Sequence, residues 1–168
     1  MEIWDLYDEN LNKVAKTISS KERVPDNYYH ISLEIWIINK KKKVLLTKNS
    51  LDYSRLYPGS WSCIGGNLCC GETIENAIAR IINQKIGSSC SLEHKKIYAP
   101  VKRDPYRYAY ITCILFDEID IKNVSFNDYS ATEAKFIDKQ EMKKMCNNGE
   151  ISYYLIERIN NKIMPYIN

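Results

Sequence analysis

The amino-acid sequence predicts an α+β fold, and three observations carry this prediction. Residues 29–48 alternate apolar and polar side chains on either side of four consecutive lysines, which is typical of two strands joined by a polar turn. Residues 73–86 carry apolar side chains at the three- and four-residue spacing of a helix that packs on a sheet. Residues 95–118 return to a β-rich composition. A helix set between groups of strands in this way indicates the α+β class.

The two ends of the chain add further elements. Residues 2–18 are expected to form a β-hairpin with Asp8-Glu9-Asn10 in its turn, because these residue types favour turns. A strand is expected near residues 133–137, followed by a C-terminal helical region over residues 138–168. Within that region an amphipathic helix is predicted from the spacing of five apolar positions, which are Ile151, Leu155, Ile156, Ile159 and Ile163.

Length and composition limit the class of protein. A chain of 168 residues predicts one domain over residues 1–168, with the hairpin and its following loop at residues 1–28. An apolar content of 45% and a charged content of 27% are those of a soluble globular protein. The sequence shows no apolar run of 18 residues and no signal peptide, so we expect a cytoplasmic protein without a membrane partner.

The most informative stretch is Gly66-Asn67-Leu68-Cys69-Cys70-Gly71-Glu72, which is followed by Arg80 and then by Gly87. The glycines permit the backbone angles of a tight loop. Thr73 is expected to cap the N-terminus of the helix, and Gly87 is expected to end it. Residues 66–88 are therefore predicted to form a loop, a helix and a second loop.

This spacing resembles the Nudix box, whose pattern is G-x5-E-x7-R-E-U-x-E-E-x-G-U, with a bulky apolar residue at each U. The resemblance implies the Nudix fold, a mixed β-sheet sandwiched between helices in an α/β/α arrangement. It also implies a hydrolase of a nucleoside diphosphate linked to another moiety. The resemblance further implies that Gly71, Glu72 and Gly87 are structural residues of the box and that Arg80 holds the loop and the helix together. Residues Pro58–Trp61 resemble the Pro-Gly-x-Trp element that leads into the box strand in this family.

The amino-terminal part is similar to the isopentenyl diphosphate isomerase-like branch of the family, because a hairpin and a loop precede His30 and the first long strand. Isomerisation itself is not predicted. The catalytic cysteine and the Gly-His pair of that enzyme correspond here to Gly65, Gly66 and Asn67. Its essential acidic residue corresponds to Lys85.

The chain departs from the box pattern where the family has glutamates after the arginine. Ile81, Gln84 and Lys85 stand there, at positions that share one face of a helix. Three carboxylates on that face would hold Mg²⁺ or Mn²⁺, which prefer oxygen ligands. At about 4 Å and an effective dielectric near 20, a pair of unit charges interacts by roughly 4 kcal/mol, so Lys85 should repel a cation there. We therefore expect a degenerate Nudix box and metal-dependent activity that is weak or lost.

Two functions remain open on these residues. A hydrolase would need Mg²⁺ or Mn²⁺, and the metal ligands would have to come from outside the helix face. The acidic candidates are Glu72, Glu75 and Glu133, of which Glu72 and Glu133 are also the catalytic candidates. A non-catalytic ligand-binding or regulatory module would need no cofactor. It would contact a small diphosphate or another anion through five residues, which are Gly65, Gly66, Arg80, Gln84 and Lys85. The plain alternative for Lys85 is a side chain that extends to solvent.

Residues 102–110 combine basic side chains with Tyr106, Tyr108 and Tyr110. They could hold phosphate and stack on a base. The alternation equally fits one face of a half-buried strand, and we favour that interpretation because tyrosine is common in sheets.

The net charge of +3 is small, so nucleic acid is not an expected partner, and a homodimer is left open. The six cysteines have no CxxC spacing, and only His30 and His94 could assist a zinc site. Reduced thiols are the expected state, and the role of Cys69 and Cys70 is left open.

Overall fold

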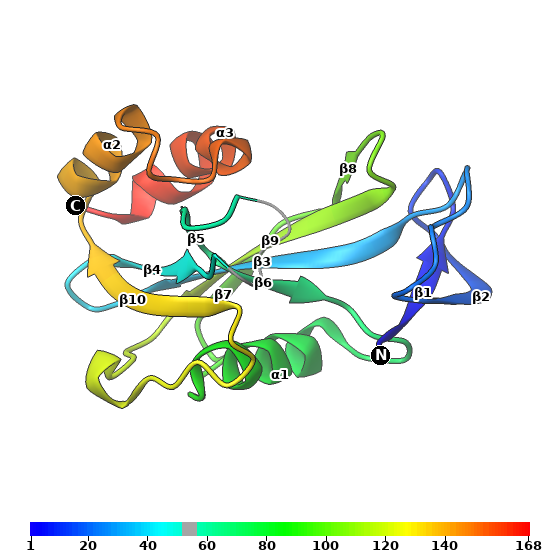
Figure 1. The fold of residues 1–168 in the computed structure, drawn as a ribbon, viewed down its shortest axis with the longest axis horizontal. Coiled ribbons are helices and arrows are strands. Elements are labelled where there is room, and N and C mark those ends of the chain that lie inside the picture. Colours follow the sequence, from blue (N-terminus) through cyan, green and yellow to red (C-terminus); the bar gives the residue numbers. More distant parts are fainter. Residues whose placement is uncertain (52–56) are drawn as a thin grey trace.

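The computed structural model describes residues 1–51 and 57–168 and has the α+β class predicted from the sequence (Figure 1). The N-terminal hairpin is present, with β1 (Ile3–Tyr7) paired antiparallel to β2 (Lys13–Ser19). An eight-stranded mixed sheet follows. Its strands are β3 (His30–Ile38), β4 (Val44–Asn49), β5 (Trp61–Ser62), β6 (Ile64–Asn67), β7 (Lys95–Ile97), β8 (Val101–Arg103), β9 (Tyr108–Phe116) and β10 (Ala131–Ile137).

The helices lie on the two faces of this sheet, with α1 (Ile74–Ile86) on one side and α2 (Lys139–Asn147) and α3 (Ile156–Arg158) on the other (Figure 1). A short 3₁₀ turn at Ile121–Asn123 precedes β10. The predicted sandwich of a mixed sheet between helices is thus confirmed. In the described part of the chain, none of the helices has both the length and the apolar character needed to cross a membrane.

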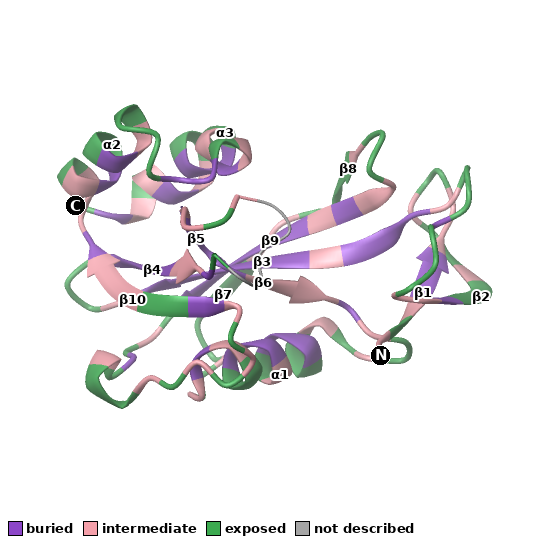
Figure 2. Cartoon of the chain, in the orientation of Figure 1, coloured by how far each residue is buried: buried purple, intermediate pink, exposed green. Residues whose placement is uncertain are grey.

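Strand β3 separates two hydrophobic cores, because its successive side chains point to opposite faces of the sheet. Ile31, Leu33, Ile35 and Ile37 pack with the buried isoleucines of α1. Trp36 and Ile38 pack instead with Met142, Met145, Leu155, Ile159 and Ile163 of the C-terminal region. Both cores appear as buried segments on either side of the central strands in Figure 2.

One edge of β3 is divided between two strands. β6 pairs with it over Ser32–Ile35, and β4 pairs with it at Ile38. The other edge of β3 pairs in parallel with β9 along its whole length. The sheet therefore splits between β4 and β6, and side chains from both of its faces can meet at the split.

The C-terminal region differs from the amphipathic helix predicted over Ile151–Ile163. Ile151 forms a bridge with Trp61, and the backbone N–H of Ser152 donates to the carbonyl of Trp61 at 3.0 Å. These strand-like contacts hold residues 151 and 152 extended, so helical structure begins only at Tyr153. It then runs as a 3₁₀ turn (Tyr153–Leu155), α3, a π-helical turn (Ile159–Ile163) and a last 3₁₀ turn (Met164–Tyr166). Leu155, Ile159 and Ile163 are buried, as the spacing predicted.

A buried ion pair ties this C-terminal region to the sheet. Glu34 points from β3 toward α3, where Arg158 donates to both of its carboxylate oxygens at 2.8 and 2.5 Å. Only 7% of the Arg158 side chain and 8% of the Glu34 side chain are exposed. The guanidinium also lies 4.1 Å from the ring centroid of Tyr110. Burial raises the pKa of Glu34, and the hydrogen bonds from Arg158 oppose that rise.

Replacing Arg158 by methionine is expected to lower the free energy of unfolding by about 3–5 kcal/mol, because the buried Glu34 carboxylate would lose its partner. Urea unfolding at pH 7 followed by circular dichroism measures this change. The matched control is Lys43→Met, which removes an ion pair to Asp138 whose side chains are 40% and 41% exposed. The control should cost less than about 1 kcal/mol. Equal losses in the two variants would contradict the prediction.

Candidate ligand-binding site

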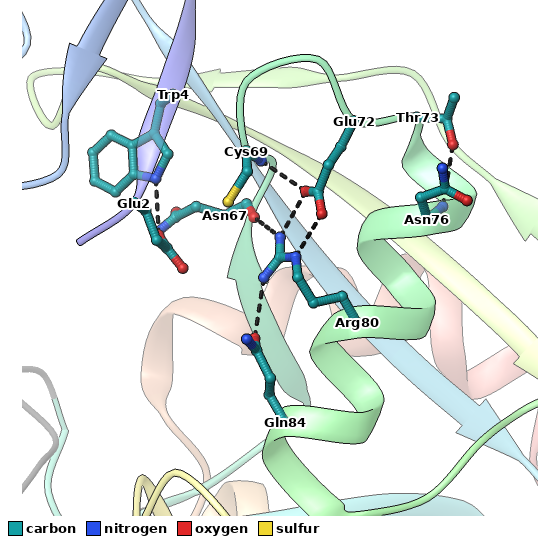
Figure 3. Close-up of polar contacts among 9 residues, drawn as sticks. All are labelled: Glu2, Trp4, Asn67, Cys69, Glu72, Thr73, Asn76, Arg80 and Gln84. Atoms are coloured by element: carbon teal, nitrogen blue, oxygen red, sulfur yellow. Dashed lines mark hydrogen bonds and ion pairs between the residues drawn. The ribbon is translucent and has the colours of Figure 1, made fainter.

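The loop between β6 and α1 is held by a network around Arg80 (Figure 3). Arg80 donates from Nε to Glu72 Oε1 at 2.6 Å and from Nη2 to Glu72 Oε2 at 2.7 Å, a bidentate pair. Nη2 also donates to the carbonyl of Asn67 at 2.8 Å, and Glu72 accepts from the backbone N–H of Cys69 at 2.9 Å. The bond from Arg80 holds the pKa of Glu72 below its ordinary value. The network fastens both sides of the loop to the helix.

The ends of α1 have the caps predicted from the sequence. Thr73 Oγ1 accepts from the backbone N–H of Asn76 at 3.2 Å (Figure 3). Gly87 adopts a left-handed φ of 61°, and its N–H donates to the carbonyl of Asn83 at 2.9 Å. Gly71 also needs a positive φ, of 76°, in the loop before the helix.

The helix face at positions 81, 84 and 85 has three different environments. Ile81 is buried, and a Cβ added at Gly66 would lie 2.8 Å from its Cγ1, so the glycine lets the strand pass close to the isoleucine. Gln84 is exposed and accepts from Arg80 Nη1 at 3.1 Å (Figure 3). Lys85 does not extend to bulk solvent.

The Lys85 ammonium is held by two partners from the loop before β10. Its Nζ lies 2.7 Å from Asp128 Oδ2 and donates to Ser130 Oγ at 2.7 Å. Burial opposes the charge of Asp128, but the bonds from Lys85 and Ser130 lower the pKa of its carboxyl group. Lys85 is therefore a fixed cation at the split of the sheet.

Each of the acidic candidates for a metal site has a cationic partner. Glu72 binds Arg80, Glu75 lies 3.7 Å from Lys95, and Glu133 accepts from Lys48 Nζ at 2.9 Å. Within residues 1–51 and 57–168, no three histidine, cysteine, aspartate or glutamate side chains come together as a metal ion would require. Mg²⁺ and Mn²⁺ require several oxygen ligands, and the apolar, neutral and cationic side chains of Ile81, Gln84 and Lys85 do not supply them. This donor set does not fit either ion.

A cavity of about 590 Å³ opens beside this helix face. Side chains from both faces of the sheet reach it, because the sheet splits here. The described residues that line it are His30, Ser32, Leu33, Glu34, Tyr57, Ser62, Cys63, Gly65, Gly66, Asn67, Lys85, Arg103, Tyr106, Tyr108, Tyr110 and Tyr154.

Of the residues predicted to contact a ligand, Gly65, Gly66 and Lys85 line this cavity. Arg80 and Gln84 lie outside its lining and hydrogen-bond to each other, so their contact with a ligand stays a prediction. The catalytic roles of Glu72 and Glu133 also stay predictions.

Sequence reasoning did not place Glu34, Tyr57 or Tyr154 in the site. Glu34 could have been noticed as an acid within the apolar run of β3, and Tyr57 as the residue before the Pro58–Trp61 element. Tyr154 comes from a distant segment that carries no motif.

Tyr108 and Tyr110 lie on one face of β9, as the strand interpretation predicted, and that face also lines the cavity. For Tyr106 the strand interpretation was wrong, because this residue lies in the exposed turn before β9.

His30 forms one end of the cavity. Its ring stacks on Trp4 with centroids 4.2 Å apart and an interplanar angle of 12°. Its Nδ1 atom is buried and has no hydrogen-bond partner among the described residues. Burial lowers the pKa of His30 to about 4, so the imidazole is neutral at pH 7.

All six cysteines are unpaired, as expected from the sequence. Cys63 lines the cavity, but it is buried, and burial raises the pKa of its thiol well above the ordinary value. A protonated thiol is a poor nucleophile, so Cys63 is a packing residue here.

Comparison with known proteins matches residues 28–157 to the family model described as the NUDIX domain. An uncharacterized Nudix hydrolase of Listeria monocytogenes is 24% identical over 165 residues, which cover 96% of this chain and 95% of the relative. An ADP-ribose pyrophosphatase of Methanocaldococcus jannaschii is 28% identical over 125 residues, covering 73% and 71%. An isopentenyl-diphosphate Delta-isomerase of Photorhabdus laumondii is 24% identical over 153 residues, covering 86% and 84%.

Among solved structures, protein DR0079 of Deinococcus radiodurans superposes with a TM-score of 0.74 at 16% identity. The match covers 95% of this chain and 98% of that one. At this identity the likeness concerns the fold alone, over nearly the whole chain.

The stability of the protein is expected to fall between pH 6.5 and about pH 4 through His30. In this range the unfolded chain binds a proton on His30 that the folded chain does not, so acid favours unfolding. The contribution lost between pH 7 and pH 4.5 is about 2 kcal/mol for a shift from 6.5 to about 4. Urea unfolding at both pH values should show a smaller loss for His30→Phe than for the wild type. The exposed His94 provides the control, and a pH dependence of His30→Phe equal to that of His94→Phe would refute the prediction.

Proposed function

The chain belongs to the NUDIX domain family, and we propose that it binds a nucleoside diphosphate linked to another moiety, with metal-dependent hydrolysis weak or lost. The ligand would occupy the cavity beside the box helix. The observation that carries the proposal is the fixed ammonium of Lys85, held by Asp128 and Ser130 on the helix face that carries glutamates in the box pattern.

The cavity supports the binding part of the proposal. A volume of about 590 Å³ suits a small organic ligand. Tyr57, Tyr106, Tyr108, Tyr110 and Tyr154 give it aromatic walls, on which a base can stack. Gly65 and Gly66 bring the backbone of β6 to the surface of the cavity without side chains in the way. The relative named as an ADP-ribose pyrophosphatase gives the class of ligand to try first.

The charges beside the cavity support the second part of the proposal, that metal-dependent hydrolysis is weak or lost. Carboxylates on the box helix would place a divalent cation against the diphosphate, and the cation would polarise the bond that breaks. Lys85 provides one positive charge, but unlike a metal ion it cannot coordinate oxygen atoms of the ligand. Ile81 is buried against Gly66 and offers no oxygen. The residues that remain can attract and orient an anion, but they supply neither a metal ligand set nor an activated nucleophile.

A second function, an active hydrolase, is favoured by the names of the relatives, two of which are a Nudix hydrolase and a pyrophosphatase. It would require Glu72 or Glu133 to give up its present cation and act on the ligand. Glu72 would have to leave a bidentate pair with Arg80 that holds the loop. We rank this function below binding for that reason.

The wild-type protein is expected to show little or no metal-stimulated turnover of a panel that includes ADP-ribose and nucleoside diphosphates with Mg²⁺ or Mn²⁺. Calorimetric titration should likewise show no binding of Mn²⁺ alone. The triple change Ile81→Glu, Gln84→Glu, Lys85→Glu is expected to create Mn²⁺ affinity by restoring the missing oxygens. Since residue 81 is buried, the double change Gln84→Glu, Lys85→Glu provides a variant that keeps the core intact.

The matched control places glutamates at Asn76, Ala79 and Asn83, which are exposed positions of the same helix. This variant gains negative charge away from the cavity and should not bind Mn²⁺ specifically. Robust metal-dependent turnover by the wild type would show that the active-hydrolase function is the correct one. Equal Mn²⁺ binding by the control would show that charge alone, and not the box face, accounts for the affinity.

A further inference from the structure

The charges that line the cavity are not fully balanced. Three charged side chains line it in the part of the chain that the structure describes, namely Glu34, Lys85 and Arg103. Glu34 is neutralised by Arg158, and Lys85 is neutralised by Asp128. Arg103 forms no ion pair with any described carboxylate within 4.0 Å. Among the described residues, Arg103 is therefore the one charged side chain of the cavity lining that has no counter-ion.

Arg103 is surrounded by aromatic rings instead. Its guanidinium carbon lies 4.7 Å from the ring centroid of Tyr154, 5.3 Å from that of Tyr106 and 5.9 Å from that of Tyr108. Its Nη1 donates to the hydroxyl of Tyr108 at 2.9 Å. The face of an aromatic ring stabilises the charge of a guanidinium but does not accept hydrogen bonds from the N–H groups that lie in the guanidinium plane. Tyr57 also forms a side-chain hydrogen bond with Arg103. The tyrosines thus fix the orientation of Arg103, and their hydroxyls occupy only part of its five N–H groups, so donors remain for a ligand.

A nearby arginine shows the contrasting arrangement. Arg107 lies in the turn between β8, which ends at Arg103, and β9, and it does not line the cavity. Its Nη2 lies 3.7 Å from Asp26, and its Nη1 donates to the hydroxyl of Tyr29 at 3.4 Å. Arg107 is thus paired with a carboxylate on the outside of the protein. Of these two arginines, the one that lines the cavity is the one without a carboxylate partner among the described residues.

We propose that Arg103 is the principal anion-binding residue of the cavity and that it receives a phosphate group of the ligand from within its tyrosine cage. A guanidinium binds phosphate oxygens in a planar, bidentate manner that suits such a fixed side chain. Tyr106, which is 60% exposed, extends the aromatic surface at the rim next to this phosphate. The inference rests on the proposed function for the nucleoside part of the ligand, while the anion site stands on the charges alone.

The test is calorimetric titration of the whole chain with ADP, with inorganic pyrophosphate and with adenosine. Arg103→Gln keeps much of the side-chain volume and removes the charge. We expect it to bind ADP and pyrophosphate about tenfold to a hundredfold more weakly, the range for a lost hydrogen bond to a charged group. Adenosine lacks phosphate, so its affinity should change by less than about twofold. Arg103→Lys should recover part of the loss, because it restores the charge without the planar fork.

Arg107→Gln is the matched control, with the same substitution four residues further along the chain and outside the cavity lining, and it should bind all three probes as the wild type does. Thermal unfolding of each variant confirms that it is folded. Wild-type affinity of Arg103→Gln for ADP and pyrophosphate would overturn the role of Arg103 and leave the proposed function intact. Binding of pyrophosphate but not ADP by the wild type, with loss in Arg103→Gln, would overturn the nucleoside ligand and keep the anion site. A wild type that binds neither probe would overturn both.

Discussion

The buried pair of Glu34 and Arg158 is the interaction on which the site depends most. It joins the middle strand of the sheet to the C-terminal region across 124 residues of sequence. Arg158 also stacks on Tyr110 and approaches Tyr154 at 5.2 Å, so the same guanidinium positions part of the aromatic wall. Because a buried ion pair brings little net stability compared with apolar packing, its main consequences here are order and charge. It cancels the one carboxylate that lines the cavity among the described residues, and it fixes the layer that closes the cavity from above the sheet.

The box network around Arg80 has the complementary role on the other side. Every donor of Arg80 that the structure pairs is directed to the loop or to the helix itself, toward Glu72, Asn67 and Gln84. Such a residue contributes to shape and has little capacity left for a ligand. At the split edge of β3, side chains from the two faces of the sheet meet in the cavity. From one side comes Lys85 with its own counter-ion, and from the other come Tyr154 and the Glu34–Arg158 pair.

Much of this arrangement was predictable because it is local. The cap at Thr73, the left-handed Gly87 and the buried isoleucines of α1 follow from residue type and spacing within one helix. The alternation along β3 predicted a strand, and the division of its side chains between two cores follows from the period of two. The start of the C-terminal helix was placed too early, because the contacts of residues 151 and 152 with Trp61 are tertiary and leave no signal in the apolar spacing. The pairings of Glu34 with Arg158 and of Lys85 with Asp128 were beyond the sequence for the same reason.

Lys85 stands where the box pattern has a glutamate, so this position carries the positive charge of an ammonium in place of a metal ligand. A bound divalent cation is exchangeable and accepts oxygens from both protein and ligand, so it couples binding to the chemistry of the bound group. An ammonium on a lysine is permanent, donates three hydrogen bonds and accepts none. Asp128 and Ser130 already accept hydrogen bonds from this ammonium, and the carboxylate of Asp128 neutralises most of its charge. In the proposed function the attraction for an anion therefore moves from the box helix to the opposite wall, where Arg103 carries a charge that no described acid offsets. On this proposal the fold is kept, and the positive charge that acts on the ligand lies where it favours binding of the ligand instead of cleavage.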